Sequence, residues 1–185
     1  QEGFAEAVKH AAIRDAAMLD ELAALDPQTR DVPADLIARN IAIKARIVEQ
    51  DEQETLGIRA LLNFGHTIGH GIEASVPYGE MLHGEAISLG IRAALWISEK
   101  HAGLSHEASL SILTALDRFH LPLVLTESIA TSTVMEKLAT DKKFSAGAIR
   151  FVVLDQLGSA KVTSSVTAED LIEAIEHLRS APSLT

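Results

Sequence analysis

Apolar residues recur at helical spacing along most of this 185-residue chain. They make up 47% of the residues, while aromatic residues make up only 4%, so the core must be built from aliphatic side chains, which suits packed helices. A chain of this length can bury one proper core. The pattern predicts a single, mainly α, multihelical domain over residues 1–185, with helices over 4–24, 33–52, 58–75, 82–100, 105–119, 131–140 and 167–179.

One region has the pattern of β-strands instead. Arg150–Leu154 and Ala160–Thr163 flank a loop that contains Gly158, which predicts a small β-hairpin near residues 150–163. No glycine-rich turn follows a strand, so the sequence carries no nucleotide-binding fingerprint. The expected fold class is therefore mainly α, with one hairpin.

Charge and composition argue against several classes of protein. The formal net charge of −10 disfavours general binding to nucleic acid or to a membrane surface. The chain has no cysteine, so a metal would have to be held by histidine and carboxylate side chains. No apolar run is long enough to span a bilayer, and no signal peptide is recognised. We expect a cytoplasmic protein with no nucleic-acid or membrane partner.

Three histidines lie within a short stretch of the sequence. His66 and His70 are four residues apart, which places both on one face of a helix, and His83 follows a short turn at the start of the next helix. Imidazole is the commonest transition-metal ligand, and histidines with one carboxylate are typical of catalytic zinc. Helix-surface or core histidines would show the same spacing. The carboxylate is left open among Glu6, Glu73 and Glu85.

The helix expected over 58–75 also carries other polar residues. Arg59, Asn63, His66 and His70 follow one another at i, i+4, i+7 and i+11, which is one continuous stripe on a straight helix. A core-facing stripe would be apolar, so this one favours an anionic, metal-bound ligand, although ordinary solvated charge remains the alternative. The glycines within this helix favour close approach of another backbone or a ligand: Gly65, Gly69 and Gly71.

Together with their flanking motifs, these residues resemble 3-dehydroquinate synthase. Arg59–Glu73 carries most of the resemblance, and His83–Ala86 extends it. Gly3–Lys9 resembles a glutamate and lysine helix of that family, Lys44 its lysine helix, and Asp141–Lys143 a later lysine motif. The motifs follow one another in the same order over almost the whole chain, which is far more specific than two spaced histidines.

The resemblance implies roles for particular side chains. Glu6, His66 and His83 would hold a divalent metal, Zn²⁺ or Co²⁺, with Lys9 beside the substrate hydroxyls. Lys9 and His70, which could assist proton movement, would be the catalytic residues. The side chains that would bind substrate are Lys44 and Arg59 for its carboxylate, and Asn63, His70 and one of Lys142 and Lys143 for its phosphate.

The resemblance also implies an activity and a domain organisation. The family converts 3-deoxy-D-arabino-heptulosonate 7-phosphate to 3-dehydroquinate in the shikimate pathway, with a metal and with NAD. In that family NAD is bound mainly by an N-terminal nucleotide-binding domain, which this sequence lacks. We therefore expect the C-terminal metal- and substrate-binding domain of a longer homodimeric enzyme, a phosphorylated sugar acid as its substrate, and no turnover by this chain alone.

Three alternatives share some of these features. Other sugar-phosphate cyclases, such as the 2-deoxy-scyllo-inosose synthase type, would have the same metal site, but Lys44 and Arg59 suit a substrate carboxylate that the inosose route lacks. Metal-dependent alcohol dehydrogenases also have a helical domain with histidine ligands, and Asn63 and His70 argue against them. A non-catalytic helical module would hold a structural metal with four protein ligands.

Overall fold

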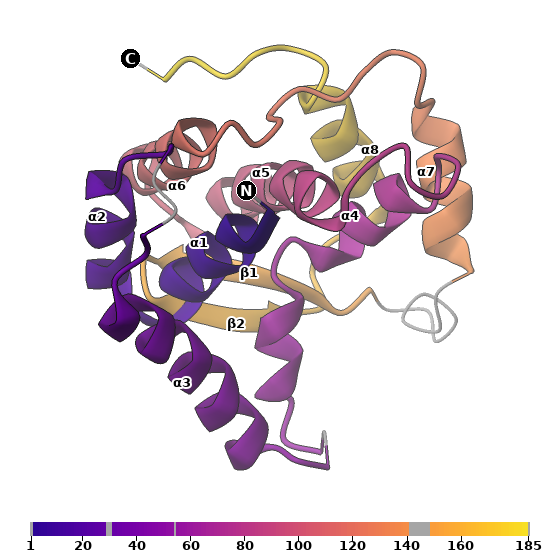
Figure 1. Cartoon of the computed structure of the whole chain (residues 1–185). Coiled ribbons are helices and arrows are strands. Elements are labelled where there is room, and N and C mark those ends of the chain that lie inside the picture. Colours follow the sequence, from indigo (N-terminus) through magenta and orange to yellow (C-terminus); the bar gives the residue numbers. More distant parts are fainter. Residues whose placement is uncertain (1, 29–30, 54, 141–148, 185) are drawn as a thin grey trace.

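A computed structural model describes residues 2–28, 31–53, 55–140 and 149–184 (Figure 1). Within those residues the chain forms α-helices, one 3₁₀ helix and one two-stranded antiparallel sheet, which confirms the expected fold class. The helices and strands are α1 (Glu2–Arg14), α2 (Ala16–Ala24), α3 (Ala34–Gln50), the 3₁₀ helix η1 (Arg59–Asn63), α4 (His66–Glu73), α5 (His83–Ala102), α6 (His106–Arg118), α7 (Thr131–Ala139), β1 (Phe151–Gln156), β2 (Ser159–Thr163) and α8 (Ala168–His177).

Helix α5 forms the centre of the core. It packs against α1, α4, α6, α8 and β1, and small residues let these neighbours come close (Figure 1). At Gly90 an added Cβ atom would lie 1.9 Å from the carbonyl oxygen of Gly65 and 2.6 Å from the amide nitrogen of Gly69. The backbones of α4 and α5 therefore touch, as the glycines of the 65–71 segment predict.

The hairpin packs on the same central helix. Phe151 to Leu154 of β1 are buried, and the Leu154 amide donates a hydrogen bond to Ser98 Oγ of α5 at 3.0 Å. Its turn is held against α1 because the Gly158 amide donates to the Ala12 carbonyl at 2.8 Å. The strands run closer to the turn than predicted, since Gln156 and Ser159 still pair.

The expected helix over 4–24 is wrong at one point, because it is broken at Asp15. There the backbone leaves the helical region (φ −149°, ψ 80°), and the Asp15 carboxylate accepts a hydrogen bond from the Met18 amide at the start of α2. The same carboxylate pairs with Arg39 of α3 at 2.8 Å. The N-cap and this ion pair favour two helices over one.

The expected helix over 58–75 is also divided. It consists of η1, a break at Phe64 and Gly65, and α4. Gly65 adopts φ 76°, the left-handed region that glycine enters at no steric cost. The break places the Phe64 side chain in the core, where it is fully buried. The prediction of one continuous helical stripe from Arg59 to His70 is therefore wrong.

No helix among the described residues is both long and apolar enough to cross a membrane.

Candidate metal centre

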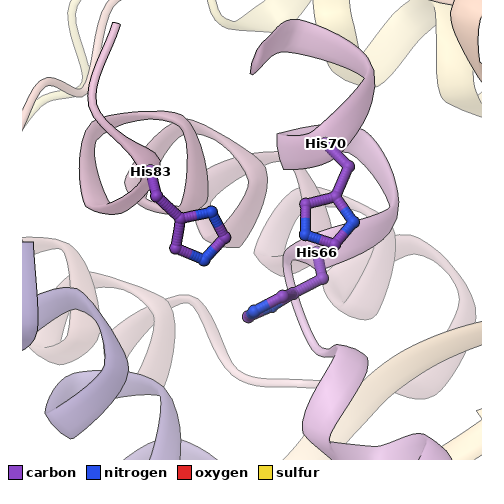
Figure 2. Close-up of side chains that lie close together, drawn as sticks. All are labelled: His66, His70 and His83. Carbon is purple, nitrogen blue, oxygen red and sulfur yellow. The ribbon is translucent and has the colours of Figure 1, made fainter. Parts of the chain in front are cut away.

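The three histidines converge in the space between α4 and α5 (Figure 2). His66 and His70 project from α4, and His83 is the first residue of α5. One nitrogen from each ring lies within 4.8 Å of the other two. Convergence follows from local structure, since a short turn joins the two helices, and it fulfils the geometric expectation from the sequence. The use of these rings as metal ligands stays a prediction.

Glu6 of α1 lies next to one of these histidines, His66. Its Oε1 atom lies 3.3 Å from His66 Nε2, and it is buried with no hydrogen-bond partner among the described residues. His66 Nδ1 lies 3.1 Å from the Phe64 carbonyl oxygen. Donation from Nδ1 would leave the Nε2 lone pair directed toward Glu6. Two ligands on one tetrahedral zinc ion are separated by about 3.3 Å, so Glu6 and His66 fit a shared divalent cation.

The charge on Glu6 is held by its neighbours. Burial would raise the pKa of its carboxyl group, but the close contact with His66, the hydrogen bond from Lys9 and the charges of both neighbours outweigh burial and hold that pKa well below its usual range. Lys9 Nζ lies 2.7 Å from Glu6 Oε2, and its side chain is only 3% exposed. Burial lowers the pKa of Lys9, although Glu6 opposes that shift. The site therefore presents a half-buried carboxylate with one oxygen paired with Lys9 and one buried oxygen that has no hydrogen bond among the described residues.

The other two carboxylates left open by the sequence have different surroundings from Glu6. Glu85 accepts a hydrogen bond from the Leu82 amide at 2.8 Å, which caps the start of α5. Glu73 Oε2 lies 3.2 Å from His83 Nδ1, at the exposed side of the group. A carboxylate on the second nitrogen of a ligating histidine typically orients the ring, so Glu73 has the position of a supporting residue.

Arg59 and Asn63 line a separate pocket of about 160 Å³ beside the hairpin. Although η1 and α4 are not one helix, Thr67 of α4 borders the same pocket. The buried Asp51 accepts hydrogen bonds from the Leu56 amide at 2.9 Å and the Arg59 amide at 3.1 Å. These backbone hydrogen bonds hold the pKa of Asp51 below its usual range, and the one from Leu56 has the largest effect. Asp51 thereby fixes the turn that presents Arg59.

Sequence reasoning missed a second cation at this pocket. Arg150, just before β1, lines it together with Arg59. Gly57 leaves room for that guanidinium, since an added Cβ atom at Gly57 would lie 3.3 Å from Arg150 Nη2. Residues 57 and 150 are far apart in the sequence, so the local pattern carried no signal for this approach.

The remaining predicted residues are not gathered in that pocket. Lys44 is exposed and borders a wider hollow of about 550 Å³ together with Glu6 and His10. The structure thus places Lys44 and Arg59, the expected carboxylate pair, in two different hollows. Lys142 and Lys143 lie outside the described residues, so their predicted contact with phosphate is not addressed by the structure.

Comparison with solved structures gives the class of fold. The chain superposes on 2-epi-5-epi-valiolone synthase from Streptomyces hygroscopicus subsp. jinggangensis 5008, a structure with NAD⁺ and Zn²⁺ bound, with a TM-score of 0.83 and 22% identity over 96% of this chain and 50% of that one. For 2-deoxy-scyllo-inosose synthase in complex with carbaglucose-6-phosphate, NAD⁺ and Co²⁺, the TM-score is 0.78, with 21% identity over 95% and 50% of the two chains. At these identities the likeness establishes the shared fold of such synthases.

Sequence comparison then gives the family. Residues 3–144 match the family model described as 3-dehydroquinate synthase C-terminal. The 3-dehydroquinate synthase of Bacillus pumilus (strain SAFR-032) is 41% identical over 179 residues, which are 95% of this chain and 48% of the relative. That of Geobacillus kaustophilus (strain HTA426) is 39% identical over 164 residues, 86% and 44% of the two. This chain belongs to the 3-dehydroquinate synthase family, and it spans about half the length of these curated relatives.

Proposed function

We propose that this chain is the metal- and substrate-binding half of a 3-dehydroquinate synthase. The reaction is the cyclisation of 3-deoxy-D-arabino-heptulosonate 7-phosphate to 3-dehydroquinate with release of phosphate. The observation that carries the proposal is the buried Glu6 Oε1 atom, free of hydrogen bonds and 3.3 Å from His66 Nε2, in a member of this family. NAD would be bound mainly by the other half of the enzyme.

Glu6, His66 and His83 are the proposed ligands of a Zn²⁺ or Co²⁺ ion. The bound ion would act as a Lewis acid on a substrate hydroxyl group. Lys9 Nζ lies 2.7 Å from the second oxygen of Glu6, and its ammonium group would contact substrate hydroxyls beside the ion. His70, whose ring centroid lies 5.2 Å from that of His66, would accept or donate a proton through its imidazole ring.

The anionic ends of the substrate would be held by the cations around this centre. Arg59 and Lys44 are proposed for the carboxylate, and Arg59 suits it because a guanidinium binds a carboxylate through two parallel hydrogen bonds. Asn63, His70 and one of Lys142 and Lys143 are proposed for the phosphate. Two arginines line the Arg59 pocket, which suits an anionic group of the substrate.

Zinc binding by this chain tests the metal centre. In calorimetric titrations the wild-type chain should bind one Zn²⁺ ion. His66→Ala and Glu6→Gln should weaken binding by more than about 100-fold, since even outer-shell partners are worth 10- to 100-fold. His106→Ala is the matched control, because the His106 side chain is 71% exposed and lies on α6. Failure of the wild-type chain to bind zinc, or equal loss in the control, would refute the proposed ligand set.

Activity requires the second half of the enzyme. The chain alone should not turn over substrate. Joined to the N-terminal half of the Bacillus pumilus relative, it should release phosphate from 3-deoxy-D-arabino-heptulosonate 7-phosphate, and only with NAD⁺ present. Phosphate release without NAD⁺ would contradict the assigned reaction.

We further propose that the joined enzyme is a cytoplasmic homodimer. A monomer in analytical ultracentrifugation would contradict the dimer, and an exported product on cell fractionation would contradict the cytoplasmic location.

A further inference from the structure

A second cavity lies at the other end of α5, away from the histidines. It has a volume of about 330 Å³ and lies between α5, α6 and the segment after α8. Trp96 and Arg92 of α5 and Ser109 of α6 border it. Trp96 is thirteen positions from His83 along the helix, a rise of about 20 Å, so this cavity is separate from the candidate metal centre.

Arg92 is a buried cation without a carboxylate partner. Arg92 is only 2% exposed. Its guanidinium donates hydrogen bonds to the backbone carbonyls of Leu123 and of His177, the latter at 3.1 Å. Within the part of the chain that the structure describes, no carboxylate forms an ion pair with it. A guanidinium has more N–H donors than these two acceptors use. Because buried charges in proteins are normally paired, Arg92 lacks an anion.

Ser109 supplies a second polar group without a partner. The residue is 1% exposed, and its Oγ atom has no hydrogen-bond partner among the described residues. A buried hydroxyl that forms no hydrogen bond costs free energy, which a ligand oxygen at this cavity would recover after rotation of the serine side chain. Arg92 and Ser109 thus border the same cavity, Arg92 with N–H donors left over from its two carbonyl contacts and Ser109 with a hydroxyl that has no partner among the described residues.

The other walls define the rest of the ligand. Trp96 and Leu110 provide apolar surface, and the Trp96 ring lies 6.1 Å from the His177 ring. Glu99 also borders the cavity, and its Oε1 atom lies 3.3 Å from His106 Nδ1. The volume is in the range of small-molecule sites. One cation, one hydroxyl and an aromatic wall match a single carboxylate on a planar apolar body.

We propose that this cavity binds a small monocarboxylate with an apolar body, held by Arg92 and Ser109 and packed against Trp96. The carbonyls of Leu123 and His177 hold the guanidinium in place before the ligand arrives. The cavity is then a ligand site distinct from the one in which the family's chemistry is proposed.

The sequence contains a single tryptophan, Trp96, and its side chain borders this cavity, so its fluorescence can report ligand binding there. We would titrate the chain with benzoate, and with benzamide as a neutral ligand of the same shape. Benzoate should give a saturable change and benzamide should not. Ser109→Ala should weaken benzoate binding about tenfold, the value of a hydrogen bond to a charged group. Ser111→Ala, an exposed serine on the same helix, should bind benzoate as the wild type does.

Arg92→Gln should abolish the response. Since Arg92 also binds two backbone carbonyls, that variant could lose its fold, and Leu110→Phe provides an independent test. Leu110 is only partly buried, and the larger side chain would fill the cavity while the core stays intact. An equal response to benzoate and benzamide, no saturable response in the wild type, or unchanged benzoate binding in Ser109→Ala or Leu110→Phe would overturn the proposal.

Discussion

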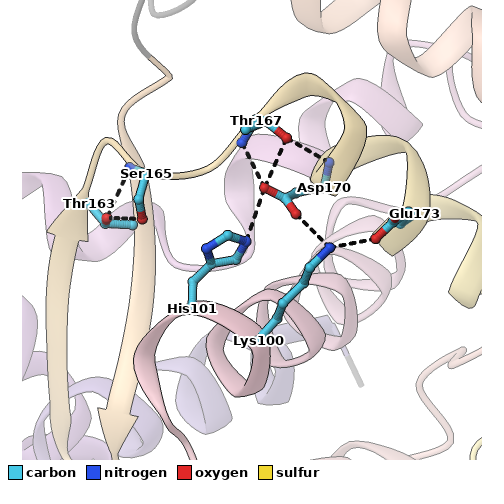
Figure 3. Close-up of polar contacts among 7 residues, drawn as sticks. All are labelled: Lys100, His101, Thr163, Ser165, Thr167, Asp170 and Glu173. Carbon is cyan, nitrogen blue, oxygen red and sulfur yellow. Dashed lines mark hydrogen bonds and ion pairs between the residues drawn. The ribbon is translucent and has the colours of Figure 1, made fainter.

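The two ends of α5 use the same kinds of side chain in opposite ways. At its start, histidines and Glu6 gather with a carboxylate oxygen that has no hydrogen bond. At its end, Asp170 of α8 is saturated: it accepts hydrogen bonds from the Thr167 amide and hydroxyl, and lies 2.8 Å from Lys100 and 3.0 Å from His101 (Figure 3). Histidine and carboxylate alone do not identify a site. What differs is whether the carboxylate oxygens find partners among the described residues: both oxygens of Asp170 do, whereas Glu6 Oε1 has no hydrogen bond.

The saturated end explains how α8 is fixed to the core. Thr167 and Asp170 form the capping box that the sequence shows, and Lys100 joins Asp170 to Glu173 (Figure 3). Burial would raise the pKa of Asp170, but hydrogen bonds from Lys100, Thr167 and His101 outweigh burial and hold that pKa well below its usual range. The Asp170 contacts at this end of α5 form a structural joint, whereas Glu6 at the histidine end keeps one carboxylate oxygen without a hydrogen bond among the described residues.

The largest expected effect is at the backbone contact that sets the histidine end. Gly90→Ala would place a methyl group 1.9 Å from the Gly65 carbonyl oxygen, which no side-chain rotation relieves. We expect a loss of about 4 kcal/mol or more in the free energy of unfolding, measured with urea. Gly3→Ala is the control, because an added Cβ atom at Gly3 meets nothing within 4 Å. Comparable stability of the two variants would show that α4 and α5 do not touch as described.

A smaller loss is expected at the saturated end. Asp170→Ala removes the acceptor of the α8 cap and leaves Lys100 without its buried partner, so the free energy of unfolding should fall by about 2–4 kcal/mol. Glu173→Ala, which removes the exposed partner of the same lysine, should cost less than about 1 kcal/mol. Zinc affinity should be unchanged in Asp170→Ala. A loss of zinc binding there would mean that the two ends of α5 are not independent.

The same carboxylate predicts the sign of a pH effect. Since the pKa of Asp170 is lower in the folded chain than its unfolded value of 3.8, its contribution is present above that pH and disappears as the pH falls below it. The difference in unfolding free energy between wild type and Asp170→Ala should therefore shrink in acid. Urea unfolding near neutral pH and well below pH 3.8 measures it; a difference that grew in acid would contradict the assigned pKa direction.

The sequence predicts those features that depend on near neighbours. Periodicity locates the helices, Thr167 and Asp170 give the start of α8, and the short turn before His83 explains the convergence with His66. Contacts between distant segments lie beyond such reasoning. The break at Asp15 depends on Arg39 of another helix, and the break at Gly65 on contact with Gly90. Glu6 was singled out only by the family resemblance, because sequence spacing alone did not distinguish it from Glu73 and Glu85.

The smallest expected effect on stability is at Arg150, which provides a further comparison with the fully partnered Asp170. Its guanidinium lines the Arg59 pocket and forms no ion pair with the residues that the structure describes. Arg150→Gln should therefore change the free energy of unfolding by less than about 0.5 kcal/mol, as surface substitutions typically do. Binding of gluconate, a polyhydroxy carboxylate, should weaken several-fold, while Arg46→Gln on the exposed face of α3 leaves it unchanged. NMR titrations that follow the arginine Nε–H signals measure gluconate binding by each variant. If Arg150→Gln cost as much stability as Asp170→Ala, Arg150 would belong to the saturated kind of site, with a structural role.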